Sequence, residues 1–366
     1  MWTKEDLVRF QQNLFIISIP IIIITGNIGS ILNVIVFSGS TKLRTSPCSL
    51  YLIFSSIGYA VYLNTVPLLR FLQTGFNIDL SAQWSWFCKL RFFTIGLFLM
   101  LPRSYMLLAA VDRYLMCKTN RHWFLHRPTT WKIIIINCLF WAIVCVHDLI
   151  FYDIQISSNS TDRTCTYQPG LYSTFLSFYS ILINGISMPL LTAIFGFLTL
   201  GNLKSLRKQI HTSIINDFQR RRKEEWLLCR MLLVQLFATI VLTLPITVAL
   251  CYNGLTQYQQ KSSFRTFVEN YIFQMCTLLQ YINAAVSFIV YSLTSRIFCK
   301  ELVLLVKYYK VRIRQALRKH SAALFARLTH SCILGLKVMI QRSELVAYYI
   351  HRGYIDTSDP ETFSME

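Results

Sequence analysis

The chain of 366 residues carries 36 Lys and Arg against 17 Asp and Glu, a net charge of +19, while 54% of its residues are hydrophobic and 14% are charged. A soluble domain has about a quarter of its residues charged. Disordered and collagen-like chains are excluded as well, because Gly and Pro are few here and aromatic residues are many. The cations lie between long apolar runs, so they indicate an anionic lipid bilayer as partner and not a nucleic acid.

Seven apolar runs are each long enough to cross a bilayer as a helix, which takes about 20 residues. In chain order they are 14–37, 49–69, 92–116, 131–151, 171–200, 226–252 and 271–293. Only helices and closed barrels satisfy their backbone in lipid, and these runs lack the alternation of barrel strands. We therefore predict an all-α membrane protein, a seven-transmembrane helix bundle. The first run is too long for the core of a signal peptide and is expected to stay as the first span.

The distribution of Lys and Arg predicts the orientation of these spans. The segments after spans 1, 3, 5 and 7 hold 27 of these cations, and the opposite side holds 8. By the positive-inside rule the N-terminus is outside. We expect an extracellular N-terminus over residues 1–13, a transmembrane domain over 14–305 and a cytoplasmic tail over 306–366.

The loop after span 4 carries two features of an extracellular segment. Asn159 begins an Asn-Ser-Thr triplet, which is a glycosylation acceptor, although such triplets also arise by chance. Cys165 follows in the same loop, and Cys88 stands at the outer start of span 3. In an oxidising compartment these two cysteines are expected to form a disulfide; the alternative is two free thiols.

A three-residue motif at the cytoplasmic end of span 3 points to a family. Asp112, Arg113 and Tyr114 stand there, the arginine twenty-five residues after Cys88. Further markers, about one per span, are Gly26-Asn27, Trp141, Pro189, Pro245, Tyr291 and, beyond span 7, Phe298. In this order the chain resembles the rhodopsin-like (class A) G-protein-coupled receptors over residues 14–305. The opening of span 2, from Pro47 to Tyr51, resembles invertebrate neuropeptide receptors of the FMRFamide type.

The resemblance implies a switch at the cytoplasmic end. Arg113 would lie where a heterotrimeric G protein inserts, and it would pair with Asp112 and, at rest, with Glu225 at the inner end of span 6. Breaking such a contact would let that helix swing out. Tyr114 and Tyr291 belong to the same region. The alternative for Glu225 is a solvated neighbour of the basic residues just before it.

Other positions either support or weaken the resemblance in the part of the family's structure that transmits the signal from the ligand to the arginine of span 3. Pro189 and Pro245 are expected to let spans 5 and 6 bend, although prolines also kink membrane helices without any switching role. Tyr59 replaces the acid that binds sodium in span 2, so no sodium site is predicted. Thr243 and Phe288 replace the family's aromatic toggle in span 6 and the proline of its span 7 motif.

Arg103 is the unusual residue of span 3. It lies ten residues before Arg113, about 15 Å further into the bilayer, where an arginine costs roughly 2.5–3.5 kcal/mol. It is therefore expected to face the interior of the bundle. Its candidate partners are Tyr59, Asn283 and the carbonyl of Phe98, which lacks a donor because residue 102 is proline. The polar contacts of Arg103 would either take part in signal transmission, as a polar relay, or only fill the interior of the bundle, as a structural plug.

Two ligand classes of the family, retinal and biogenic amines, are not expected for this chain. Retinal receptors of the family need a lysine in span 7, near the place of Tyr281, and amine receptors need an acid in span 3, where Ile95 stands. The outer acids available to a cationic ligand are Glu5, Asp6, Asp79, Asp148, Asp153, Asp162 and Glu269. Asp148 is the most deeply embedded of them and therefore a candidate functional residue, with a hydrated helix end as the alternative. We expect a neuropeptide that binds near Ile95, Asp148, Glu269 and Tyr281. The alternative is a small chemosensory ligand.

The tail carries weaker signals. Phe298 indicates a short eighth helix parallel to the membrane, and Cys299 is placed for palmitoylation. Residues 300–342 interleave basic and apolar residues, which suggests contact with an anionic inner leaflet. Hydroxyl residues among acids at 356–366 suggest a receptor kinase and arrestin as further partners. The expected location is the plasma membrane.

No enzyme constellation, metal site or cofactor site emerges from the sequence. A transporter or channel is a second class, disfavoured because no internal repeat and no coupled set of intramembrane acids is visible. A receptor that binds without signalling is a third, made credible by Thr243 and Phe288. Substitution of Arg113 would silence a receptor and spare a transporter.

Overall fold

The computed structural model describes residues 4–44, 46–76, 78–119, 127–156, 163–167, 170–210, 216–256, 258–295, 298–308, 310–312 and 314–315. Within these ranges the side chains of 41–42, 116–119, 127, 156, 184, 200, 202–210 and 216–229 are not described. The chain forms two compact units, Met1–Val303 and Leu304–Glu366, and the helical bundle belongs to the first.

Seven helices are long and apolar enough to cross a membrane, in the part of the chain that the structure describes. The seven-helix prediction is thereby confirmed. Their elements are α1 (Lys4–Gly39), α3 (Pro47–Phe76), α4 (Ser85–Thr119), α5 with α6 (Arg127–Val144 and Val146–Phe151), α7 with a π-helical stretch and α8 (Leu171–Tyr179, Ser180–Ser187 and Met188–Ile210), α9 (Asn216–Thr256) and α10 (Ser263–Thr294). Two short helices, α2 (Thr41–Arg44) and η1 (Leu80–Ala82), and the strands β1 (Tyr152–Ile156) and β2 (Arg163–Tyr167) join them.

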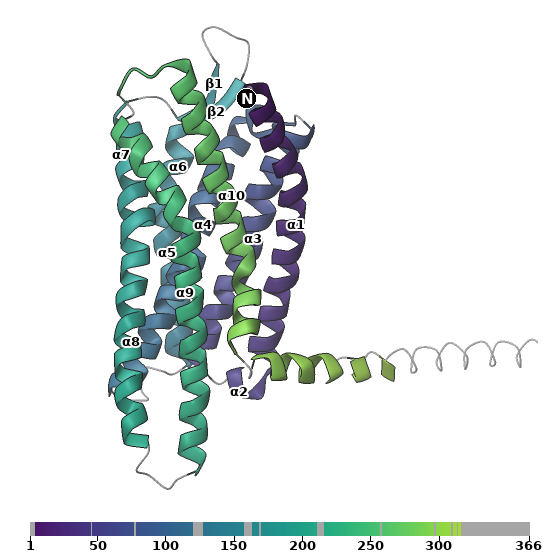
Figure 1. Ribbon diagram of the computed structural model, residues 1–366, viewed down its shortest axis with the longest axis vertical. Coiled ribbons are helices and arrows are strands. Elements are labelled where there is room, and N and C mark those ends of the chain that lie inside the picture. Colours follow the sequence, from purple (N-terminus) through teal and green to yellow (C-terminus); the bar gives the residue numbers. More distant parts are fainter. Residues whose placement is uncertain are drawn as a thin grey trace, which may run out of the picture. The chain divides into compact units, whose positions relative to one another are not determined.

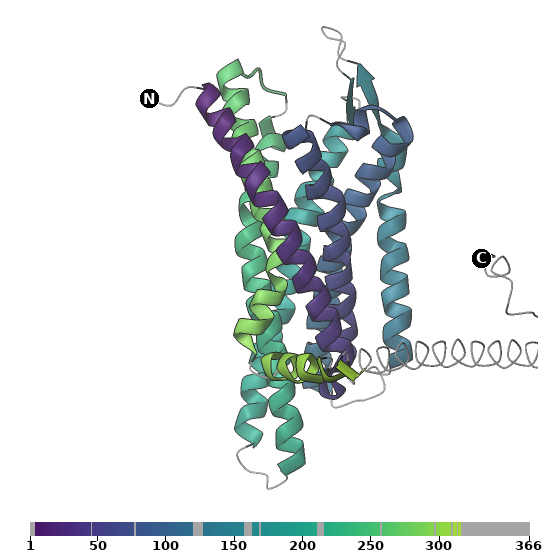
Figure 2. The same ribbon diagram turned by 90° about the vertical axis from the view of Figure 1, so that its right-hand side faces the viewer.

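The helices close into a ring in which α4 has the most neighbours. Neighbours in the ring are α1 and α3, α3 and α4, α4 and α8, α8 and α9, and α9 and α10, and α10 returns to α1 (Figure 1). In Figure 2, α1 runs obliquely across the bundle from the end of α10 to α3. Because α4 contacts α3, α5, α6, α8 and α9, a residue on it can reach most of the bundle.

Many large apolar side chains of the bundle face outward, and the helices pack closely against one another on the inside. Ile17, Ile24 and Ile31 on α1 are each more than half exposed, as expected of side chains that meet lipid. On the inner face, a Cβ at Gly26 would stand 2.3 Å from Leu63 Cδ1 and 3.0 Å from Ala285 Cβ. Only glycine allows α1, α3 and α10 to approach this closely.

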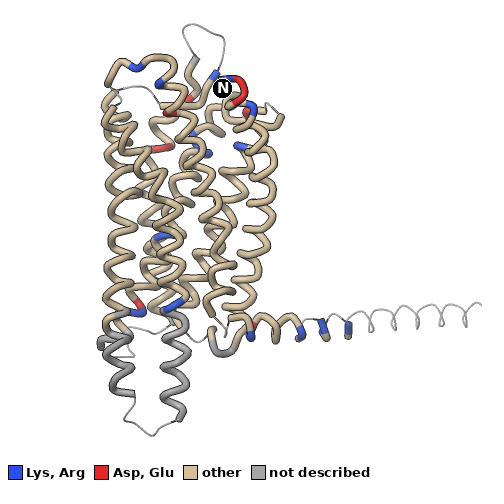
Figure 3. The backbone as a smooth tube through the Cα atoms, viewed as in Figure 1, with Lys and Arg blue, Asp and Glu red and all other residues tan. Residues whose placement is uncertain are grey.

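Charged residues of the bundle gather at its two ends and are nearly absent between them (Figure 3). One end carries the N-terminus of α1 and the antiparallel β1–β2 hairpin (Figure 1). The Asp112-Arg113-Tyr114 motif of α4 lies at the other end, since α4 begins beside the hairpin and ends at Thr119. Two opposite ends are therefore available for two different partners.

Two of the predicted spans are not continuous α-helices. Span 4 is interrupted by a turn at Cys145, between α5 and α6. Span 5 contains the π-helical stretch Ser180–Ser187, which ends just before Pro189. Proline has no N–H to continue the α-helical ladder, and a wider turn accommodates this. Pro245, in contrast, lies inside an uninterrupted α9.

Helix ends differ most from the sequence-based expectation. α1 begins at Lys4, ten residues before the expected start, with Glu5 and Asp6 in its first turn. Carboxylates favour a helix N-terminus, and hydropathy does not register this effect. Beyond α10, residues 298–308 are helical, and Phe298 is fully buried against Phe37 at 5.5 Å between ring centroids. That this helix lies along a membrane stays a prediction.

Candidate functional site

Among the described residues, Arg113 is the most enclosed charged side chain at the end of the bundle opposite the hairpin, with 2% of its surface exposed. Its Nη2 lies 2.7 Å and its Nε 3.2 Å from Asp112 Oδ2. The same Nη2 donates to Ser46 Oγ at 2.9 Å. Ser46 precedes α3, in the connection from α2. The guanidinium is thus held by its neighbour in sequence and by the connection between α2 and α3.

The expected partner Glu225 lies on α9, but its side chain is outside the described residues. Sequence reasoning missed Ser46 as a partner. The only signal that could have found it is a hydroxyl residue directly before Pro47, at the start of a span that packs against α4.

A narrow space beside Arg113 is closed by α8 and α9. Its walls include Ala110, Thr192, Gly196 and Leu232. A Cβ at Gly196 would stand 3.0 Å from Leu233 Cδ2, so the two helices are in close contact there. Tyr114 also faces α8, with its ring centroid 5.8 Å from that of Phe195. On this side, the described residues of α8 and α9 therefore cover Arg113.

Tyr291 lies near the inner end of α10 and is buried. Its ring centroid lies 5.8 Å from that of Phe37 and 6.1 Å from that of Phe298. Phe288 also contacts Phe298, at 5.8 Å between ring centroids. The region that lacks the family's span 7 proline is therefore packed by aromatic rings.

The middle of the bundle holds a network of polar side chains around Arg103. Arg103 is half-buried and interacts electrostatically with Tyr59 and Tyr62. Tyr59 in turn hydrogen-bonds Asn283 and donates to Met106 Sδ at 3.7 Å. Two of the three expected partners of Arg103 thus belong to its network, Tyr59 directly and Asn283 through Tyr59. Tyr62 is an addition that only the fold reveals.

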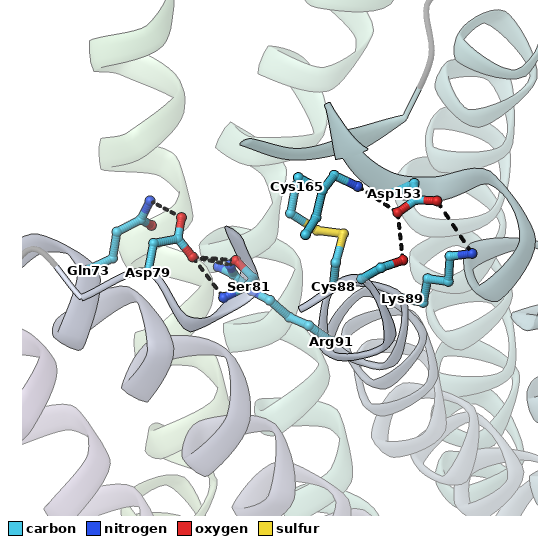
Figure 4. The surroundings of a disulfide bond; sticks show 10 residues. Gln73, Asp79, Ser81, Cys88, Lys89, Arg91, Asp153 and Cys165 are labelled. Carbon is cyan, nitrogen blue, oxygen red and sulfur yellow. Dashed lines mark hydrogen bonds and ion pairs between the residues drawn. A yellow bond between two sulfur atoms is a disulfide. The ribbon is translucent and has the colours of Figure 1, made fainter. Parts of the chain in front are cut away.

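The outer end is organised by a disulfide between Cys88 and Cys165, with 5.7 Å between their Cα atoms (Figure 4). The predicted disulfide is confirmed. It joins the first turn of α4 to β2, and Cys165 pairs with Ile154 of β1. The β-hairpin is therefore fixed over the outer mouth of α4.

A second tie between hairpin and helix is ionic. Asp153 of β1 accepts from Ser85 Oγ at 2.6 Å and from the N–H of Ile154 at 2.8 Å, and it lies 3.6 Å from Lys89 Nζ (Figure 4). The hydrogen bond from Ser85, then that from Ile154, and then Lys89 hold the pKa of Asp153 below its ordinary value of 3.8. Near neutral pH this carboxylate is charged and paired.

A third cluster on the same end surrounds Asp148 of α6. The carboxylate is buried, and its Oδ1 lies 3.2 Å from His147 Nδ1 and 3.3 Å from the Tyr172 hydroxyl, which donates to it. A Cβ at Gly96 would stand 2.8 Å from its Oδ2. The rings of Phe175 and Tyr179 flank His147 at 5.5 Å and 5.3 Å. Asp148 thus joins α4, α6 and α7.

The four residues expected near the ligand fall in three places. Ile95 is half-buried on α4, one residue before Gly96, which packs on Asp148. Tyr281 is buried in the core formed by α1, α3 and α10, with its ring 6.3 Å from that of Tyr62. Glu269, near the start of α10, bonds Lys261 and Arg265. Gly96, and not Ile95, is thus the α4 residue whose position meets Asp148.

Two expected modification sites have different outcomes. Asn159 lies outside the described residues. Cys299 is half-buried, and its Sγ donates to the carbonyl of Ser292 at 2.9 Å. Among the residues that the structure describes, no group of three or more His, Cys, Asp or Glu could hold a metal ion.

A model of the family "7 transmembrane receptor (rhodopsin family)" matches residues 29–291, which is well over half of the 366 residues. The chain therefore belongs to the rhodopsin family of seven-transmembrane receptors. No curated protein matches it. Membership makes the chain a multi-pass membrane receptor and not an enzyme. The disulfide at one end of the bundle and the enclosed Arg113 at the other end are the two features that bear on a signalling function.

Proposed function

We propose that this receptor binds an extracellular neuropeptide at the end that carries the β-hairpin and activates a heterotrimeric G protein at the end that carries Arg113. The observation that supports this most directly is the burial of Arg113 between Asp112 and Ser46. A buried guanidinium with exchangeable partners is a two-state element that a cytoplasmic protein can bias. The plasma membrane and an outside N-terminus follow from the same proposal.

Activation in this proposal is an outward movement of the cytoplasmic half of α9. The contact between Gly196 and Leu233 would open, and Arg113 would exchange Ser46 for groups of the G protein. Pro245 marks the place where α9 can bend, since residue 241 lacks its α-helical donor there. If Glu225 pairs with Arg113 at rest, that contact breaks in the same movement.

The peptide is proposed to bind beneath the hairpin, near Ile95 and Asp148. Asp148 is a buried carboxylate whose partners, His147 and Tyr172, are neutral groups when the histidine is unprotonated. A cationic group of the ligand would compensate it better than either does. The resemblance of residues 47–51 to FMRFamide-type receptors favours amidated peptides. Receptor kinase and arrestin are proposed partners of the tail, which lies outside the described residues beyond 315.

The test is to express the receptor with a promiscuous G protein, verify its surface delivery and measure intracellular calcium against pools of amidated neuropeptides. A saturable response that is lost in Arg113→Ala at equal surface expression supports the proposal. A response that survives in Arg113→Ala contradicts the switch. Silence of both forms, with surface expression proven and no raised baseline, would favour a chemosensory ligand or a receptor that binds without signalling.

A receptor that binds without signalling is the second candidate. It is favoured by Thr243, which is buried where the family has a large aromatic toggle, and by Phe288, which packs on Phe298 where the family has proline. In that case labelled peptide would bind the cell surface, and no G protein would respond. Substrate flux across the membrane in Arg113→Ala would instead indicate a transporter.

A further inference from the structure

A hollow between α9 and α10 lies apart from the proposed peptide and G-protein sites. Its volume is about 730 Å³, within the range of about 300–1,000 Å³ that small-molecule sites occupy. The two helices lie side by side (Figure 1). The apolar walls of this α9–α10 hollow come from both of them and include Pro245, Val248, Ala249, Val268, Ile272 and Cys276.

The hollow opens toward the outside of the bundle. Leu244, Val248 and Ile272 line it and are 56%, 59% and 49% exposed. Side chains with this exposure in the middle of a transmembrane helix face the acyl chains of the bilayer. A ligand can therefore enter this hollow from the membrane and does not have to pass the β-hairpin.

One end of the hollow is polar and carries a net positive charge. Glu269 Oε1 lies 2.9 Å from Arg265 Nε and accepts from the Tyr252 hydroxyl at 3.0 Å, and Glu269 Oε2 lies 2.5 Å from Lys261 Nζ. Two cations thus share one carboxylate. Arg265 also donates through Nη2 to Tyr252 and Gln259. Within the described residues its Nη1 makes no hydrogen bond, and its side chain is 39% exposed.

The polar end and the apolar floor are far enough apart to hold part of a long acyl chain, and the rest of the chain can extend into the bilayer through the open side of the hollow. Pro245 precedes Tyr252 by seven residues, and Glu269 precedes Cys276 by seven, which is about 10 Å along each helix. The polar end lies close to where α9 ends at Thr256 and α10 begins at Ser263. Headgroups lie at this depth, and cations are stable there.

We propose that the α9–α10 hollow binds a long-chain fatty acid from the surrounding leaflet, with the acyl chain on the apolar walls and the carboxylate on Arg265. A single carboxylate neutralises the net charge of +1 that Lys261, Arg265 and Glu269 share. The free Nη1 of Arg265 can donate to it without loss of the bond to Glu269. This site lies apart from the proposed peptide site at Asp148 and from the proposed G-protein site at Arg113. Because Pro245 forms its floor, a bound chain would press on the point where α9 can bend.

The test uses purified receptor in nanodiscs of neutral phosphatidylcholine with a photoreactive diazirine-bearing palmitate, and mass spectrometry maps the cross-links after irradiation. We expect labelling of segments 244–252 and 268–276, competed by unlabelled palmitate. Labelling spread evenly over all lipid-facing helices would overturn the proposal. The same diazirine chain with an alcohol head should label at least tenfold less, because a charge-assisted hydrogen bond is lost. Equal labelling by the alcohol would refute the carboxylate site.

Two pairs of variants sharpen this test. Ile272→Trp fills the hollow and should abolish the labelling, whereas Ile289→Trp, at a position of 50% exposure on the same helix outside the hollow, should not. Arg265→Gln should weaken the labelling about tenfold, whereas Lys89→Gln, which removes a cation paired with Asp153, should not. Melting curves establish that each variant is folded. Unchanged labelling in folded Ile272→Trp would overturn the site.

Discussion

Replacing Ser46 with alanine should raise signalling in the absence of ligand. The hydroxyl of Ser46 accepts a hydrogen bond of 2.9 Å from Arg113 Nη2, and Arg113 is 2% exposed. Activation as proposed above breaks this bond, so it stabilises the resting state alone. Its removal should shift the equilibrium toward the active state.

The size of this shift follows from the chemistry of the bond. A hydrogen bond to a charged group contributes about 1.5–3 kcal/mol, and 1.4 kcal/mol is a factor of ten in an equilibrium constant. The ratio of active to resting receptor should therefore rise about tenfold or more. A receptor that is about 1% active without ligand would become about 10% active. Asp112 continues to hold Arg113, so the protein should still fold.

The assay is basal G-protein activation per receptor at the cell surface, compared between wild type and Ser46→Ala. The structure offers a matched control in Ser49, one turn further along α3, whose buried hydroxyl has no hydrogen-bond partner among the described residues. Ser49→Ala should leave basal activity unchanged. The reasoning is refuted if Ser46→Ala leaves the basal activity unchanged in a receptor whose ligand response is intact and depends on Arg113.

Three further outcomes are expected. Gly96→Ala should lower the melting temperature, because its methyl group would stand 2.8 Å from Asp148 Oδ2 and such overpacking costs about 1–3 kcal/mol. Cys88→Ser should reduce surface expression, since loss of a native disulfide costs about 2–5 kcal/mol; flow cytometry measures this. Ser85→Ala should destabilise the protein near pH 6, because a carboxylate with a lowered pKa stabilises the fold above its ordinary pKa of 3.8. The difference from wild type should shrink as the pH falls below 3.8 through the lowered pKa of Asp153.

Each of these outcomes has its own check. Gly75→Ala, where the nearest atoms would be 3.8 Å away, should not lower the melting temperature, because alanine favours a helix over glycine. A Cys165→Ser variant should match Cys88→Ser, and the double variant should be no worse than either. For Ser85→Ala, a melting difference that stays constant from pH 6 to pH 2 would show that the hydroxyl acts through packing and not through the charge of Asp153.

The sequence was sufficient for the number of helices because the bilayer imposes a length that hydropathy measures directly. It was sufficient for the disulfide because Cys88 and Cys165 are the two cysteines placed outside the membrane. Helix ends were predicted less well, and α1 starts at Lys4 because charged residues in its first turn extend the helix into water. The break at Cys145 carries no Pro or Gly signal that a reader of the sequence could use.

The candidate site was predicted in part for a related reason. Arg113 and Asp112 are adjacent in sequence, so their pairing needed no knowledge of the fold. Ser46 is 67 residues from Arg113, and only the packing of α3 on α4 brings them together. Asp148 was expected to be the most membrane-embedded of the outer acids, with a hydrated helix end as the alternative; its burial and its contact with Tyr172 depend on how α7 approaches α6. Long-range pairs of this kind follow from packing and not from local pattern.

The π-helical stretch Ser180–Ser187 affects how this chain is to be aligned with other receptors. In an α-helix each residue advances the direction of the side chain by 100°, and a π turn takes in an extra residue. If the side-chain directions of α7 are extrapolated from Pro189 with ideal α-helical geometry, residues of α7 are therefore placed on the wrong face of the helix. The rings of Tyr172, Phe175 and Tyr179, all before this stretch, contact His147. In a homologue that lacks one residue of this stretch, the three rings would point in another direction relative to His147. A gap of one position in an alignment would then mark a different binding surface.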